Sequence, residues 1–131
     1  MITFVNSILG ARTNRYAGPL ELLAGIAGRV PYFGLHVTEN RKAQGLIVPG
    51  DDIAPEMFAH DSFYTYYAYA FGEIVGDRVW AMDGFPPHIS VDNLKNMSAT
   101  LASSGGIALF HLVGITPEAQ TLEMAFQGEK P

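Results

Sequence analysis

The sequence contains no cysteine among its 131 residues, and this absence excludes several kinds of chemistry. Without thiols the chain cannot form a disulfide framework, a zinc ribbon, a cysteine nucleophile or a thiolate-held iron–sulfur cluster. Basic residues are few as well: 8 Lys and Arg stand against 13 Asp and Glu, which gives a formal net charge of −5. Since no run of Lys or Arg occurs, we expect no binding to nucleic acid.

Long apolar runs are also missing. No apolar stretch reaches the roughly 18 residues that a membrane span needs, and the N-terminus lacks the basic and apolar regions of a signal peptide. We therefore expect a soluble, cytoplasmic protein with no membrane partner. The length and the 48% hydrophobic content suit a single domain over residues 1–131 with a real core. The abrupt apolar start at residues 2–5 suggests a piece of something longer.

Short β-rich runs alternate with segments of helical period along the chain. The pattern predicts strands at residues 2–6, 32–37, 79–82 and 107–113. It predicts helices at residues 19–28, 55–74, 90–105 and from 117 onward, with a loop at residues 45–55. Their ends are marked by Pro19, Gly28, Ser90, Thr116 and Pro117. This alternation favours an α/β fold, with a mostly parallel sheet of about four strands and helices on its faces.

Ligands of open parallel sheets bind beyond the carboxyl ends of the strands, so the loops after the predicted strands matter most. The loop after the first predicted strand is rich in polar side chains, namely Asn6, Ser7, Arg12, Thr13, Asn14 and Arg15. Two guanidiniums beside free backbone N–H groups predict a site for a carboxylate or a phosphate. The alternative is that both arginines are solvated loop residues with an ion pair each.

The loop after the second predicted strand brings four chemically capable side chains into six positions: His36, Glu39, Asn40 and Arg41. Two metal-capable groups three residues apart form no complete coordination set, so the pattern predicts no metal site. General acid–base work by His36 or Glu39 is open, and so is a purely structural histidine. His111, inside the last apolar run, is interpreted as a hydrogen-bonded core histidine.

The predicted helix at residues 55–74 carries aromatic side chains on all sides. Aromatic residues can stack on nucleic-acid bases, but no basic groove accompanies them here. Such a helix is typical of a position between two layers. Any part of it left uncovered favours self-association, so a homo-oligomer is possible.

Four segments together resemble the catalytic (large) subunit of aconitase X. They are FVNSILGARTNR at residues 4–15, GLHVTENR at 34–41, ASSG at 102–105 and ALFHLVGITPEA at 108–119. The resemblance runs in order over nearly the whole chain. It implies an aconitase-like α/β subdomain, so that residues 1–131 would be a fragment of a larger catalytic subunit.

The resemblance also implies a function. Aconitase X proteins are hydro-lyases that dehydrate small hydroxy acids such as cis-3-hydroxy-L-proline or phosphomevalonate. The family implies an iron–sulfur cluster for the full-length enzyme and, as partners, the rest of the catalytic subunit and a small swivel domain. No cofactor is expected on this chain, because the cluster cysteines of the family lie outside the matched region.

By this resemblance, the two polar loops would contact substrate. Asn6, Ser7, Arg12, Thr13, Asn14 and Arg15 would line the pocket, with the arginines on the carboxylate or phosphate. His36, Glu39, Asn40 and Arg41 would orient substrate or water, and no general base can be assigned.

Three hypotheses follow. The first is a substrate-binding segment of an aconitase X dehydratase that is inactive alone. The second is a non-catalytic module with the same fold that binds a small anion or a partner. The third is a metal-independent lyase.

Overall fold

The computed structural model describes residues 1–50 and 53–131, and a parallel sheet lies at its centre. The strands are β1 (Leu46–Ile47), β2 (Ala81–Met82) and β3 (His111–Leu112), in the order β1-β2-β3. Both neighbouring pairs are parallel. The expected α/β class with a parallel sheet is confirmed, although the described residues form three strands rather than about four.

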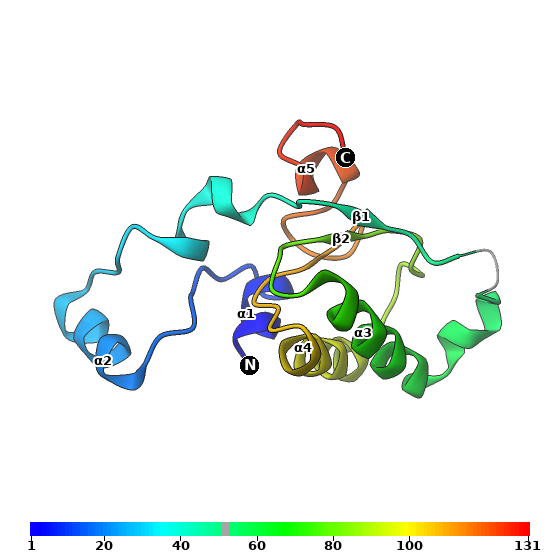
Figure 1. The fold of residues 1–131 in the computed structure, drawn as a ribbon, viewed down its shortest axis with the longest axis horizontal. Helices are drawn as coiled ribbons and strands as arrows, with labels where there is room; N and C mark the ends of the chain where they lie inside the picture. The colour runs from blue at the N-terminus through cyan, green and yellow to red at the C-terminus, as the bar shows by residue number, and fades with distance from the viewer. Residues whose placement is uncertain (51–52) are drawn as a thin grey trace.

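Two long helices cover one face of the sheet (Figure 1). They are α3 (Asp61–Val75) and α4 (Val91–Ser104), which pack against each other. The main core lies between them and the sheet, and includes Phe71, Met97, Leu101 and Met82, all almost fully buried. This burial of apolar side chains supplies most of the stabilisation of the fold.

A smaller cluster covers the opposite face. It consists of Ala43, Ala81, Ala119, Ala125 and Phe126. Ala125 ends the short helix α5 (Leu122–Ala125), which lies across the sheet from α3 and α4 (Figure 1). Because most of these side chains are small, the C-terminal segment approaches the sheet closely.

The first predicted strand is wrong, since its residues form the helix α1 (Ile2–Ser7). The β-branched run suggested a strand, but strand propensity yields to tertiary packing. The buried residues of α1 are Thr3, Asn6 and Ser7, at helical spacing. The Thr3 hydroxyl donates to the Ile107 carbonyl at 2.7 Å, and the helix packs against α4.

Two other predicted elements are also wrong. The predicted strand at residues 32–37 contains the 3₁₀ turn η1 (Gly34–His36), because Gly34 has a φ of +57° that breaks extended pairing. The last helix begins at Leu122 rather than after Thr116, since the Thr116 hydroxyl bonds back to the Leu112 backbone at 3.1 Å instead of capping a helix. Thr121 caps that helix.

The strands predicted at residues 79–82 and 107–113 are present, but each is only two residues long. The predicted loop at residues 45–55 contains β1, and Asp51 and Asp52 lie outside the described residues. The predicted aromatic helix divides into the 3₁₀ helix η3 (Pro55–Ala59) and α3, because His60 is extended between them. No helix in the described ranges is long and apolar enough to span a bilayer.

Several local signals are confirmed. The Ser90 hydroxyl accepts from the Asn93 backbone N–H at 3.1 Å and caps α4. Helix α2 (Gly18–Ala27) carries Pro19 in its first turn and ends at Gly28, whose φ of +62° is left-handed. Both signals act within a few residues, so the sequence specifies them without help from the rest of the fold.

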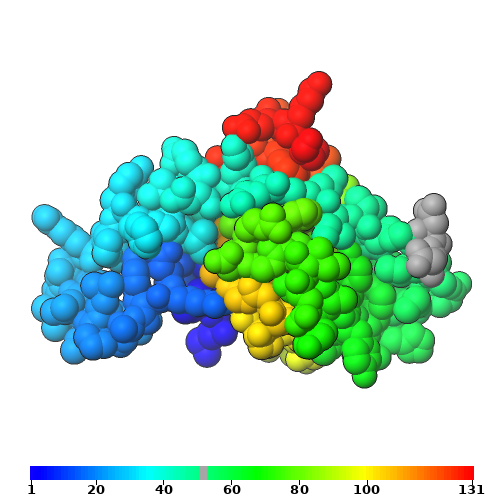
Figure 2. Space-filling model, in the orientation of Figure 1, coloured from blue at the N-terminus to red at the C-terminus, as the bar shows by residue number. Residues whose placement is uncertain are grey.

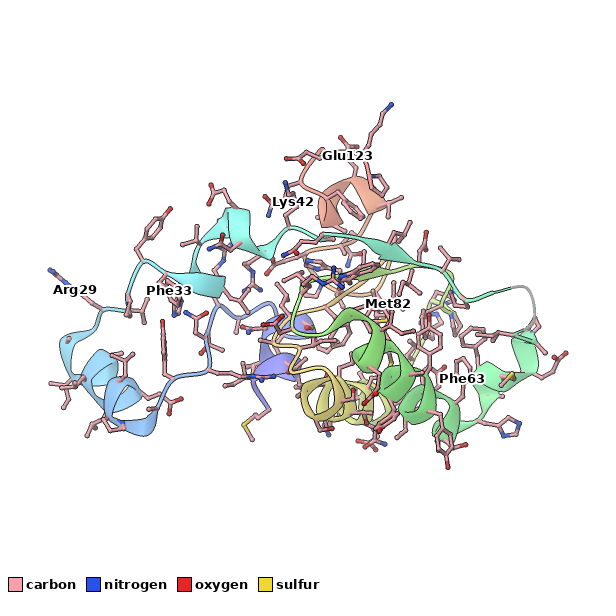
Figure 3. The ribbon with its side chains drawn as sticks, viewed as in Figure 1. Arg29, Phe33, Lys42, Phe63, Met82 and Glu123 are labelled. Carbon is pink, nitrogen blue, oxygen red and sulfur yellow. The ribbon has the colours of Figure 1, made fainter. Side chains whose placement is uncertain are left out.

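Helix α2 forms an arm that projects from the body of the molecule (Figures 1 and 2). None of its residues is buried, and Leu22, Leu23 and Ile26 are each at least 60% exposed. Arg29 points away from the body at the far end of the arm, whereas Met82 lies inside the core (Figure 3).

Candidate functional site

The amide of Asn6 closes the first polar loop. Its Oδ1 accepts from the Thr13 N–H at 3.0 Å, and its Nδ2 donates to the Thr13 and Ala108 carbonyls at 2.9 and 3.1 Å. The adjacent Ser7 hydroxyl accepts from the Phe110 N–H at 3.0 Å. Asn6 and Ser7 are both buried, so they join α1 to the segment that leads into β3.

Arg12 and Asn14 connect the first polar loop to the second. Nη1 of Arg12 donates to the His36 carbonyl at 3.2 Å and to the Thr38 hydroxyl at 2.8 Å. Oδ1 of Asn14 accepts from the Leu35 N–H at 2.7 Å. The loops that the sequence analysis treated separately therefore lie side by side.

The side chains of the second loop differ in how exposed they are. The His36 ring stacks on Tyr16, with centroids 5.8 Å apart, and its buried Nε2 has no hydrogen-bond partner among residues 1–50 and 53–131. Glu39 and Asn40 are exposed, and Asn40 Nδ2 donates to the Gly34 carbonyl at 3.0 Å. Both lie within the 3₁₀ turn that ends at Arg41.

Arg41 is the most deeply buried charged side chain of the described residues, at 1% exposure. It belongs to the 3₁₀ turn η2 (Thr38–Arg41), and its guanidinium donates to the carbonyls of Leu35, Asn6 and Ala11. Its Nε lies 2.8 and 2.9 Å from the two carboxylate oxygens of Glu118. The guanidinium thus faces protein groups and not solvent.

Sequence reasoning placed Glu118 in the first turn of a helix and missed this ion pair. The signal that could have found it is weak, because a single acidic residue 77 positions from an arginine has many possible partners. Charge-assisted, bidentate contacts of this kind are among the strongest in proteins. Arg41 and Glu118 together fix the two polar loops against the segment that follows β3.

His111 is confirmed as a hydrogen-bonded core histidine. Its Nε2 lies 2.7 Å from the Arg41 carbonyl, and the residue is 2% exposed. Burial lowers its pKa, because the charged imidazolium is poorly solvated there. The neutral His111 ring is therefore part of the buried structure that supports the Arg41 backbone.

An open cleft of about 560 Å³ lies beside these loops. It is lined by Asn14, Arg15, Tyr16, Phe33, Gly34, Leu35, Asp77, Gly106 and Ala108. Arg15 is held at its edge because Nη2 donates to the Ile107 carbonyl at 2.8 Å. Two predicted site residues, Asn14 and Arg15, line the cleft, whereas Tyr16, Asp77 and Gly106 were missed.

Comparison with known proteins shows the family to which these loops belong. Residues 43–131 match the family model described as the aconitase X second domain, and residues 1–39 match the aconitase X first domain. The chain belongs to the aconitase X family. Arg41 lies between the two matched regions, so its bonds join first-domain loops to Glu118 of the second.

Curated relatives are much longer than this aconitase X chain. The phosphomevalonate dehydratase large subunit of Methanocaldococcus jannaschii is 38% identical over 94% of this chain and 31% of its own length. The cis-3-hydroxy-L-proline dehydratase of Pseudomonas aeruginosa is 36% identical over 99% of this chain and 22% of its own. The chain therefore spans less than a third of either relative.

A solved structure supports the same placement. The crystal structure of Thermococcus kodakaraensis aconitase X in its holo form matches with a TM-score of 0.77 and 37% identity. The match covers 91% of this chain and 29% of that one. It supports the conclusion from the family models that this chain corresponds to a segment of the aconitase X fold.

The family implies an iron–sulfur cluster in the full-length enzyme. Such clusters are held by cysteine thiolates, and this sequence has no cysteine. Over residues 1–50 and 53–131, no group of three His, Asp or Glu side chains is placed to hold a metal ion. The residues of this chain therefore do not fit the cluster.

Proposed function

We propose that this chain forms part of the substrate pocket of an aconitase X hydro-lyase. The substrate would be a small hydroxy acid such as the compounds for which the relatives are named, phosphomevalonate and cis-3-hydroxy-L-proline. The observation that carries the proposal is the cleft at the junction of the two polar loops, with Arg15 on its wall. A guanidinium in that place suits the carboxylate or phosphate of such an acid.

In this proposal some of the predicted residues bind substrate, and the others hold the loops in place. Arg15 binds the anionic group of the substrate, and exposed Arg12 adds a second positive charge nearby. Asn6, Ser7, Thr13 and Asn14 hold the loop in shape through the backbone bonds described above, and buried Arg41 holds both loops together. His36 stacks on Tyr16 and Asn40 donates to the Gly34 carbonyl, and both partners line the cleft. In the proposal His36, Asn40 and Glu39 orient substrate or water from there.

We further propose that residues 1–131 fold as one α/β unit and that this unit catalyses no dehydration by itself. A dehydratase needs a base for the proton and an acid for the leaving hydroxyl, and the sequence offers no thiolate ligand for the cluster of the family. Activity would then need the rest of the catalytic subunit and a swivel domain.

The test is anion binding by the 131-residue chain. Two charge-assisted hydrogen bonds, less the cost of association, give an affinity of about 1 mM at best. Addition of inorganic phosphate should shift the backbone amide signals of residues 12–16 and 106–108 in NMR spectra. The double variant Arg12→Ala/Arg15→Ala should lose these shifts, whereas Arg29→Ala, at the far end of the arm, should keep them.

Unchanged shifts in the double variant would overturn the proposal. The alternative, a non-catalytic module that binds a small anion, gives the same phosphate result. The two are separated by placing the double substitution in the full-length enzyme, where the dehydratase rate per folded molecule should fall if the arginines bind substrate.

A further inference from the structure

The cleft contains one negative group as well as one positive group. A Cβ built on Gly106 would lie 3.8 Å from Cβ of Asp77 and 3.9 Å from Nη1 of Arg15. An atom of each residue therefore lies within 4 Å of this Cβ position on Gly106. Among the described residues neither takes part in an ion pair, so they do not neutralise each other.

Arg15 and Asp77 both line the cleft beside Gly106. Arg15 is anchored through Nη2 to the Ile107 carbonyl, which leaves Nη1 toward Gly106. Asp77 follows Gly76, the residue that ends α3. Gly106 has a φ of +69° and no side chain, so it adds no atoms of its own to the space beside Asp77 and Arg15.

The remaining lining suits a small ring or carbon chain. Tyr16, Phe33 and Leu35 supply aromatic and aliphatic surface beside the charges. The Tyr16 hydroxyl accepts from Asn14 Nδ2 at 2.8 Å, which fixes the position of its ring. The cleft thus brings one arginine, one aspartate and apolar side chains together in one cavity of about 560 Å³.

We propose that Asp77 is a specificity-determining residue of this cleft, and that it pairs with the ammonium group of an amino-acid ligand whose carboxylate Arg15 holds. The inference rests on the proposed function and narrows its substrate class. A zwitterionic amino acid places opposite charges on one carbon, which matches the two groups around Gly106. A phosphorylated hydroxy acid has two anionic groups and no cation, so Asp77 repels it.

The test compares two probes that differ in the cation. L-Proline carries a secondary ammonium and a carboxylate, whereas N-acetyl-L-proline keeps the carboxylate and has no positive charge. In NMR titrations of the 131-residue chain, L-proline should bind about five-fold more tightly than the N-acetyl compound, the factor of an exposed ion pair. Asp77→Asn should abolish this five-fold difference in affinity. Glu73→Gln, which removes a charge from the exposed surface of α3, should preserve the difference.

A third probe tests the repulsion. Mevalonate 5-phosphate should bind Asp77→Asn more tightly than the unchanged chain by a similar factor. If Asp77→Asn left the affinity for L-proline relative to N-acetyl-L-proline unaltered, the role of Asp77 would be overturned. If Arg12→Ala/Arg15→Ala still abolished binding in that case, the proposed function would stand. If none of the probes shifted the cleft signals, both proposals would fail together.

Discussion

At the scale of single residues, the predicted binding side chains divide into those that face the cleft and those that support it. Arg15 faces the cleft, whereas Arg41 is buried and bonded to three carbonyls and to Glu118. An arginine that faces a cleft and an arginine that supports a loop cannot be told apart in the sequence, because the sequence does not show which acceptors surround the guanidinium. The structural role of Arg41 became visible only with its partner Glu118.

The Arg41–Glu118 pair gives the first prediction. Glu118→Gln leaves a buried guanidinium without its counter-charge, so the free energy of unfolding should fall by about 3 kcal/mol. Urea unfolding followed by circular dichroism measures the change. Glu129→Gln is the matched control, because its ion pair with Lys42 is exposed and should contribute less than about 1 kcal/mol. Equal losses in the two variants would contradict the role of the buried pair.

Tyr67 gives a pH prediction. Its buried hydroxyl has no hydrogen-bond partner among the described residues, and burial raises its pKa to about 12 from the usual 10.0. Since the unfolded chain releases this proton first, the stabilisation is complete below pH 10 and is lost as the pH rises toward 12. The free energy of unfolding should therefore fall less steeply above pH 10 in Tyr67→Phe than in the unchanged chain.

Tyr66→Phe is the control for this pH effect, because Tyr66 is 75% exposed. At neutral pH, Tyr67→Phe should be neutral or slightly stabilising, since it removes a buried hydroxyl that makes no hydrogen bond within the described part of the chain. A Tyr67→Phe profile identical to that of Tyr66→Phe would show that burial of this ring does not couple to stability.

At the scale of elements, the junction between α3 and α4 depends on two glycines. A Cβ on Gly72 would lie only 2.0 Å from Ser104 Oγ, and one on Gly105 would lie 2.5 Å from the Gly72 carbonyl oxygen. The C-terminal turns of the two helices therefore meet backbone to backbone. The predicted helix at residues 90–105 ends at Gly105, but nothing in the sequence pattern connects this glycine with Gly72.

Gly72→Ala tests this junction. The added methyl forces the helices apart, so the free energy of unfolding should fall by about 1–3 kcal/mol. Gly25→Ala in α2 is the control, because a Cβ there would meet no described residue within 4 Å beyond its own stretch of helix, and alanine favours a helix. Thermal unfolding of both variants measures the difference. If both substitutions left the melting temperature unchanged, the close approach would not constrain α3 and α4.

At the scale of the whole molecule, the uncovered apolar surface is concentrated on the arm. Residues of α2 and the segment after it are exposed, including Ile26 at 76%, Tyr32 at 86% and Phe33 at 68%. The aromatic helix α3 buries Phe63, Tyr64 and Phe71 but exposes Tyr66 and Tyr69. Apolar surface of this kind favours association.

We expect the chain to self-associate at about 1 mM, since uncovered apolar patches bury each other at high concentration. Leu22→Gln/Ile26→Gln should shift the sedimentation-equilibrium mass toward that of the 14.2 kDa monomer. Val91→Gln/Met124→Gln, which changes exposed apolar residues outside the arm, should have less effect. A monomeric mass for the unchanged chain at this concentration would count against the prediction.

The sequence by itself determined the features that depend on near neighbours or on an extended motif. The cap at Ser90 and the end of α2 at Gly28 are each encoded within a few residues. The α/β class and the family resemblance follow from patterns that run along the whole chain. Tertiary structure decided the rest. Residues 2–7 became a helix because their polar side chains bond to the segment before β3, and Arg41 became a support because Glu118 reaches it across 77 positions. Contacts between distant segments outweigh local propensity, and these contacts determine where the loops that line the cleft lie.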